Sequence, residues 1–125
     1  MDLFNKLKEK KILLIDDDEW IRDSLSLFFK NEGCHLLAIE TAEEALKLLT
    51  KQSYEIIITD YRLPGMDGLE FFKKIQNSHP QVVKILVTAY GSQDVLSEAM
   101  KIGIQDIIKK PFTTKVIEES LSRLI

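Results

Sequence analysis

Short apolar runs rich in isoleucine, leucine and valine recur along this chain and constrain its fold more than any other feature. They lack the polar alternation of a half-exposed strand, which is typical of strands buried on both faces of a parallel sheet. Segments of helical periodicity separate them. The predicted strands are KILLI (11–15), HLLAI (35–39), EIIIT (55–59), KILVT (84–88) and DIIK (106–109).

The segments between the strands place apolar residues on one helical stripe each. The clearest stripes are Ile21, Leu25, Phe28 and Phe29, then Ala42, Ala45, Leu46 and Leu49, and finally Val116, Ile117, Leu121 and Leu124. Thr41 and Glu44 have the spacing of a capping box. Gly33 and Gly103 stand where the helices after the first and fourth predicted strands are expected to end. Five strand–helix units in succession predict an α/β fold with a doubly wound parallel sheet and helices on both faces.

A five-stranded sheet of this kind favours the flavodoxin-like strand order 2-1-3-4-5. The length of 125 residues suits one domain, predicted to span 1–125 with residues 1–10 as an N-terminal lead-in. A net charge of −3 argues against direct nucleic-acid binding and against attachment to a membrane surface. The chain has no stretch of roughly 18 apolar residues that could span a membrane, so we expect a cytoplasmic protein.

Carboxylates crowd the end of the first predicted strand, where LLIDDDEW places Asp16, Asp17 and Asp18 in succession. In the predicted order, the ends of strands one and three flank the switch point where such sheets bind ligands, and strand three is followed by Asp60. Crowded like charges cost stability unless a cation compensates them. Asp16, Asp17 and Asp60 therefore predict a cation site, whereas Asp18 is better explained as a helix cap or a solvated charge.

A hydroxyl and an ammonium are expected at the same sheet edge, because strand four ends in Thr88 and strand five is followed by Lys110. Three carboxylates and one lysine leave two negative charges, which a single divalent cation would neutralise. Carboxylate oxygens around a cleft favour Mg²⁺, which is usually held together with a phosphate oxygen. The set predicts phosphoryl transfer, with one carboxylate as nucleophile and with Thr88 and Lys110 binding phosphoryl oxygens.

Four stretches carry a family resemblance: ILLIDDDEWIR, IIITDYRLPGMDGLEF, ILVTAYG and IIKKPF. Together they resemble the receiver domain of bacterial two-component response regulators, in order and at the right spacing over nearly the whole chain. The resemblance implies that Asp60 is the phosphoacceptor, that Asp17 binds Mg²⁺ directly and that Asp16 assists through water. It also implies that the main-chain carbonyl of Arg62 completes the metal shell.

The same resemblance implies a switch. It implies that the Thr88 hydroxyl and the Lys110 ammonium bind the transferred phosphoryl group and that the Lys110–Pro111 bond is cis. Ile107 stands where such domains commonly carry tyrosine or phenylalanine, so the usual coupling between the threonine and a rotating aromatic ring is not available here. The expected conformational change is at the face made by the fourth predicted helix, the strand 106–109 and the fifth helix.

Two bulky residues, Arg62 and Tyr90, lie two positions after Asp60 and Thr88. They are predicted to flank the pocket mouth, where they either shield the acyl phosphate from water or extend into solvent. A receiver also implies a sensor histidine kinase or phosphotransfer protein as donor, and an unidentified downstream protein partner. We expect self-phosphotransfer and autodephosphorylation as its only chemistry, and an output through another molecule because no output segment follows Ile125.

Alternative functions remain open from the sequence alone. An apolar strand followed by Asp16, Asp17 and Asp18 also suits a Mg²⁺-dependent phosphatase of the haloacid dehalogenase type, although Trp20 stands where that family has threonine or valine. A pseudo-receiver that binds partners without phosphate is a further alternative, and the complete set of acids, threonine and lysine argues against it. A flavin-binding flavodoxin is disfavoured because carboxylates after strand one would repel the cofactor phosphate.

Overall fold

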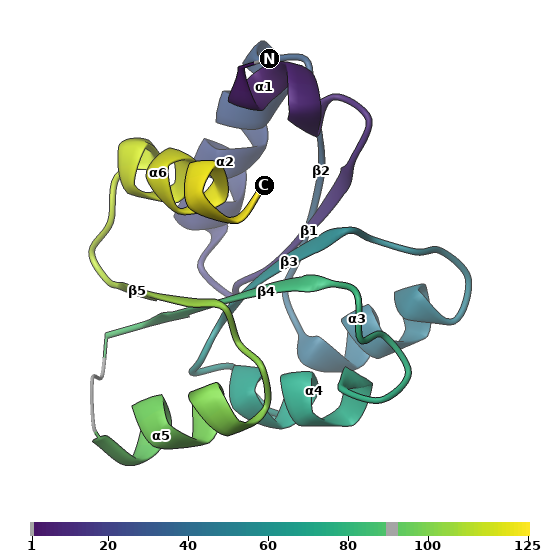
Figure 1. The fold of residues 1–125 in the computed structure, drawn as a ribbon, viewed down its shortest axis with the longest axis vertical. Helices are drawn as coiled ribbons and strands as arrows, with labels where there is room; N and C mark the ends of the chain where they lie inside the picture. Colours follow the sequence, from purple (N-terminus) through teal and green to yellow (C-terminus); the bar gives the residue numbers. More distant parts are fainter. Residues whose placement is uncertain (1, 90–92) are drawn as a thin grey trace.

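A computed structural model describes residues 2–89 and 93–125 and places a parallel sheet between two layers of helices (Figure 1). The strands are β1 (Lys11–Ile15), β2 (His35–Ile39), β3 (Ile56–Asp60), β4 (Val83–Thr88) and β5 (Asp106–Lys109). Their order is β2-β1-β3-β4-β5, and every neighbouring pair is parallel. This confirms the doubly wound fold and the flavodoxin-like order, whose switch point lies between β1 and β3.

The helices divide between the two faces of the sheet (Figure 1). One side carries α1 (Leu3–Leu7), α2 (Glu19–Asn31) and α6 (Thr114–Leu124), and the other carries α3 (Ala42–Leu49), α4 (Gly68–Ile75) and α5 (Gln93–Lys101). A hydrophobic core lies on each face of the sheet, and successive strand residues point into different cores. Leu14 packs beneath α2 and α6, whereas Leu13 packs beneath α3 and α4. Among the described residues, no helix combines the length and the apolar character that a membrane crossing requires.

The first ten residues contain a helix that the sequence analysis did not predict. Asp2 caps α1 by accepting a hydrogen bond of 3.0 Å from the main-chain N–H of Asn5. Leu7 is fully buried, and the Phe4 ring meets the Phe28 ring edge-on with centroids 5.9 Å apart. The segment expected to be only a lead-in is therefore packed against α2.

The helix ends follow local sequence signals. Gly33 has a φ of 73°, the left-handed conformation with which glycine ends helices, as predicted. The main-chain N–H of Glu44 donates to the hydroxyl of Thr41 at 3.1 Å, so this half of the predicted capping box is confirmed. A complete capping box joins Asp67 to Glu70 at the start of α4, and the sequence analysis missed it.

Lys84 is a buried charge within the otherwise apolar strand β4. The residue is 4% exposed, and its ammonium donates a hydrogen bond of 3.2 Å to the main-chain oxygen of Val82. Burial penalises the charged form and lowers the pKa of Lys84. The folded state therefore holds this proton less tightly than the unfolded chain does.

We predict that Lys84→Met is more stable than the wild type at neutral pH, by about 1 kcal/mol, because it removes the desolvated charge. The penalty is complete below the lowered folded pKa and vanishes above the unfolded value of 10.5. The difference between the two proteins should therefore shrink as the pH rises towards 10.5. Urea unfolding of both proteins across this range checks the prediction, and a gap that widens with pH would contradict it.

Candidate functional site

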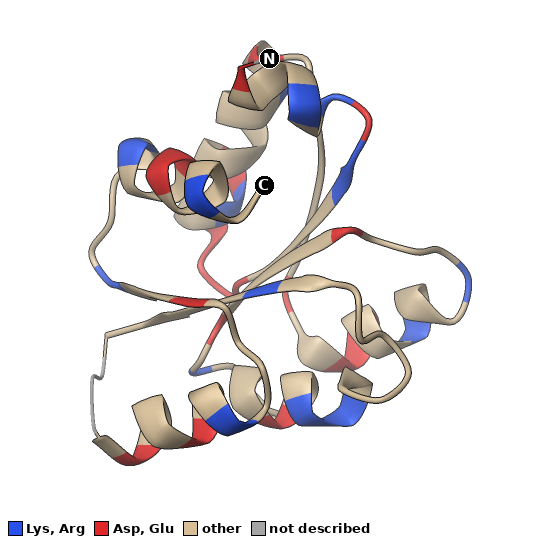
Figure 2. Cartoon of the chain, viewed as in Figure 1, with Lys and Arg blue, Asp and Glu red and all other residues tan. Residues whose placement is uncertain are grey.

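Three carboxylates meet at the switch point, where Figure 2 shows acidic residues on the segments that leave β1 and β3. β3 begins one residue later than predicted and ends on Asp60, so this side chain occupies the last strand position. Asp60 is 6% exposed, Asp16 is 1% exposed, and Asp17 is exposed. One carboxylate oxygen from each lies within 4.8 Å of the others. The structure therefore brings together the three acids that the sequence analysis grouped.

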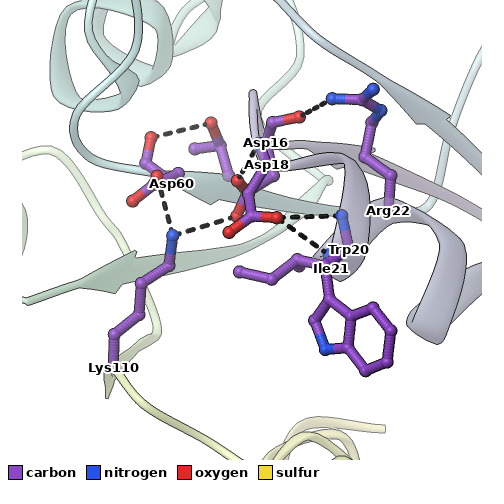
Figure 3. Close-up of polar contacts among 8 residues, drawn as sticks. Asp16, Asp18, Trp20, Ile21, Arg22, Asp60 and Lys110 are labelled. Carbon is purple, nitrogen blue, oxygen red and sulfur yellow. Dashed lines mark hydrogen bonds and ion pairs between the residues drawn. The ribbon is translucent and has the colours of Figure 1, made fainter.

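Lys110 joins two of these acids (Figure 3). Its Nζ lies 2.9 Å from Oδ2 of Asp60 and 3.2 Å from Oδ2 of Asp16. The main-chain N–H of Lys110 donates to the main-chain oxygen of Thr88 at 2.9 Å, and Thr88 itself is buried at the end of β4. The Lys110–Pro111 bond is cis, as predicted. All the residues predicted to contact the phosphoryl group thus lie at one edge of the sheet.

Two opposing effects set the pKa values in this pocket, namely the burial of the acids and the positive charge of Lys110. Burial raises the pKa of Asp16, and the negative charge of Asp60 adds to that effect. Burial likewise raises the pKa of Asp60, although the hydrogen bond from Lys110 opposes the shift. For Lys110, burial works against the charged form, but the bond to Asp60 and the charges of both acids raise its pKa overall. One ammonium therefore compensates only part of the negative charge.

Local hydrogen bonds fix the acid that follows β1. The main-chain N–H of Asp18 donates to Oδ1 of Asp16 at 2.9 Å, and Asp18 itself caps α2, as predicted. Nη1 of Arg22 donates to the main-chain oxygen of Asp16 at 2.9 Å (Figure 3), and its Nη2 lies 3.6 Å from Glu40. The sequence analysis missed Arg22, because neither its spacing nor its residue type signals a bond to a backbone oxygen.

The chain after β3 is held against the site. The main-chain N–H of Tyr61 donates to the oxygen of Val87 at 2.7 Å, and the N–H of Gly68 donates to the oxygen of Tyr61 at 2.8 Å. A Cβ built on Gly68 would lie far inside van der Waals contact with the main-chain oxygen of Asp60. Glycine is therefore required here by a close approach of the backbone to the acid-bearing strand.

The remaining predicted residues have different surroundings. The Arg62 side chain is exposed, with Cζ 6.0 Å from the centroid of the Tyr61 ring. Tyr90, the other predicted rim residue, lies outside the described residues. Ile107 is partly buried against the core that contains Leu86. Trp20 is 79% exposed and lines a groove of about 510 Å³ that also borders Lys110, so it belongs to the rim and not to the core.

The donor set suits a hard divalent cation. Carboxylate oxygens are the ligands that Mg²⁺ prefers, and three of them lie within 4.8 Å of one another at this site. Two of the three acids have raised pKa values because they are buried, so added positive charge would favour their ionised forms. The structure therefore contains an acidic cluster able to hold a metal ion beside a lysine.

Comparisons with known proteins identify the family. The "Response regulator receiver domain" family matches residues 12–122. The response regulator protein FleR of Pseudomonas aeruginosa is 34% identical over 90% of this chain, which spans only 24% of FleR. Sporulation initiation phosphotransferase F of Bacillus subtilis is 29% identical over 95% of this chain and 96% of its own length. The chemotaxis response regulator CheY4 of Vibrio cholerae aligns with a TM-score of 0.84 and 26% identity, covering 93% of this chain and 98% of CheY4.

The chain therefore belongs to the response regulator receiver domain family. Members of this family are phosphorylation-controlled signalling switches of two-component systems, and the fold is that of the CheY-like structures. This identification supports the receiver function that the sequence analysis favoured. The comparisons give no support to a haloacid dehalogenase-type phosphatase or to a phosphate-independent scaffold.

We predict that Lys110→Met destabilises the metal-free protein by about 2 kcal/mol, because two crowded acids lose the cation between them. Added Mg²⁺ should restore part of the loss, since it returns positive charge to the same place. Urea unfolding in EDTA and in Mg²⁺ measures both effects. Lys109→Met is the matched control, because Lys109 is the exposed neighbour and the charge change is the same. Equal losses in the two variants would contradict the prediction.

We predict that Gly68→Ala costs about 3 kcal/mol of stability and shifts the NMR signals of Asp60, because the new methyl group displaces the end of β3. Gly103→Ala provides a contrast. Gly103 ends α5 with a φ of 80° and has open space around it, so alanine there costs about 1–2 kcal/mol of backbone strain and leaves Asp60 unaffected. Unchanged Asp60 signals in Gly68→Ala would contradict the close-approach argument.

Proposed function

We propose that this chain accepts one phosphoryl group on Asp60, in a Mg²⁺-dependent reaction, from a sensor histidine kinase or a phosphotransfer protein. The observation that carries the proposal is the position of Lys110, with Nζ 2.9 Å from Asp60 and 3.2 Å from Asp16. A relative that the chain covers almost completely is named a phosphotransferase, which supports the same chemistry.

Asp16, Asp17 and Asp60, with the main-chain carbonyl of Arg62, would hold the Mg²⁺. Asp17 would be the direct carboxylate ligand beside Asp60, and Asp16 would act through water. When bound, Mg²⁺ supplies positive charge that offsets the negative charge developing on the phosphoryl oxygens. The oxygens of the three acids lie close enough together, within 4.8 Å, to share one ion.

Asp60 is the proposed nucleophile. One carboxylate oxygen forms a bond to phosphorus while the bond from phosphorus to the donor's imidazole nitrogen breaks, and that nitrogen keeps the electron pair. Lys110 then binds one phosphoryl oxygen, and the hydroxyl of Thr88 donates to another. Autodephosphorylation by water is the only other reaction that we assign. Arg62 and Tyr90, the two residues predicted to flank the pocket mouth, would set its rate by shielding the acyl phosphate.

The conformational signal starts at Thr88. Its hydroxyl moves towards the phosphoryl group, and the end of β4 moves with it. Ile107 has no aromatic ring to rotate, so the signal reaches the face of α5, β5 and α6 through aliphatic packing. Ile107 packs against the core that contains Leu86 and Val95, which connects β4 to α5. Shifting such a switch from 1:99 to 99:1 takes about 5.5 kcal/mol of differential interaction.

The proposed unit of function is the single receiver domain of residues 1–125, acting in the cytoplasm. Its output passes to a downstream protein partner of unknown identity. The net charge of −3 gives no basis for direct nucleic-acid or membrane binding by this domain.

The direct test is the intact mass of the protein after incubation with Mg²⁺ and acetyl phosphate. We predict one added phosphoryl group on the wild type and none on Asp60→Asn, because the amide is not a nucleophile. EDTA should abolish the adduct on the wild type. Asp23→Asn, on an exposed position of α2, is the matched control and should be modified like the wild type. An unmodified wild type, or an adduct on Asp60→Asn, would refute the proposal.

A further inference from the structure

A glutamate on a neighbouring helix contacts the loop that follows the phosphoacceptor. Glu43 lies in the first turn of α3, and its Oε2 accepts a hydrogen bond of 3.0 Å from the main-chain N–H of Met66. This bond lowers the pKa of Glu43, because it favours the charged form. α3 and the loop are thereby joined by a charge-assisted bond across 23 residues of sequence.

Gly65 shows how closely this carboxylate approaches the loop. A Cβ built on Gly65 would lie 2.6 Å from Oε2 of Glu43, so the absence of a side chain makes room for the contact. The φ of Gly65 is 76°, a left-handed conformation that other residues rarely adopt. The turn therefore directs the N–H of Met66 towards α3.

The loop held in this way carries a proposed metal ligand. Its ends are fixed by the bond from Tyr61 to β4 and by the capping box of Asp67 at α4. Arg62, whose main-chain carbonyl is proposed to complete the Mg²⁺ shell, lies between these ends and four residues before Met66. The turn at Met66 and the carbonyl of Arg62 therefore belong to one short stretch of chain, so a contact at the turn can act on the carbonyl.

We propose that Glu43 is a positioning residue, which holds the loop between β3 and α4 so that the carbonyl of Arg62 faces the metal site. This inference rests on the proposed function, because it concerns Mg²⁺ bound beside Asp60. Glu43 touches neither the metal nor the phosphoryl group and acts through the N–H of Met66. Outer partners of metal ligands commonly change metal affinity when they are removed.

Glu44 offers a matched control. It is the next residue on the same helical turn and is also exposed. Its carboxylate accepts a hydrogen bond from the hydroxyl of Thr41, the N-cap residue of α3. Glu43→Ala and Glu44→Ala change the net charge equally and both remove a carboxylate from the first turn of α3. A difference between them therefore reports the contact with Met66 and not the general loss of negative charge.

The experiment measures Mg²⁺ affinity by titration calorimetry for the wild type, Glu43→Ala, Glu43→Gln and Glu44→Ala. We expect Glu43→Ala to bind Mg²⁺ roughly tenfold more weakly and Glu44→Ala to bind like the wild type. Glu43→Gln should lie between them, because its amide oxygen still accepts a hydrogen bond without the charge. In metal-free NMR spectra, the Met66 amide signal should shift in Glu43→Ala and stay in place in Glu44→Ala.

The outcomes separate the two proposals. A wild type that binds no Mg²⁺ refutes the proposed function, whereas the Met66 signal still shows whether the contact exists. A wild type that binds Mg²⁺, with equal affinities in Glu43→Ala and Glu44→Ala, overturns the role of Glu43 alone. An unmoved Met66 signal in Glu43→Ala overturns it as well, because the contact itself would be missing.

Discussion

The ammonium of Lys110 lies between two buried carboxylates, and the organisation of the site depends on this interaction. Asp16 follows β1 and Asp60 ends β3, and the two would repel each other in a place where burial already raises their pKa values. Lys110 lies 2.9 Å from Asp60 and 3.2 Å from Asp16, so it offsets part of that cost. The charge that remains uncompensated makes the pocket receptive to a divalent cation.

The strand order connects this local arrangement to the part of the sheet that can change conformation. β1 and β3 bring the acids together, whereas β4 and β5 carry Thr88 and Lys110 to the same edge. A group bound at this edge is therefore coupled to the strands that lie beside α5 and α6. A phosphoryl group on Asp60 would add negative charge next to Lys110 and Thr88, and the side of the sheet that can respond is the one that carries these two residues.

Much of this could be predicted from the sequence, because the relevant residues recur with a regular period or stand at strand ends. The apolar runs predicted the strands. The rule that ligands bind at the switch point predicted that Asp16, Asp17 and Asp60 lie together. The capping box of Asp67 and Glu70 also has a sequence signature and could have been found. The contacts of Arg22 and Glu43 could not, because each joins a side chain to the backbone of another segment and leaves no periodic trace. The same holds for the packing of α1, because Phe4 contacts Phe28 of α2, which is distant in the sequence.

The central claim is that one bound divalent cation neutralises the negative charge that Lys110 leaves uncompensated at the switch point. The most direct test is the free energy of unfolding of the wild type as a function of Mg²⁺ concentration, measured in urea at constant ionic strength. The account predicts that stability rises by about 1.4 kcal/mol for each tenfold increase in Mg²⁺ above the dissociation constant, the slope expected for one bound ion. Stability that does not change with Mg²⁺ would contradict the account.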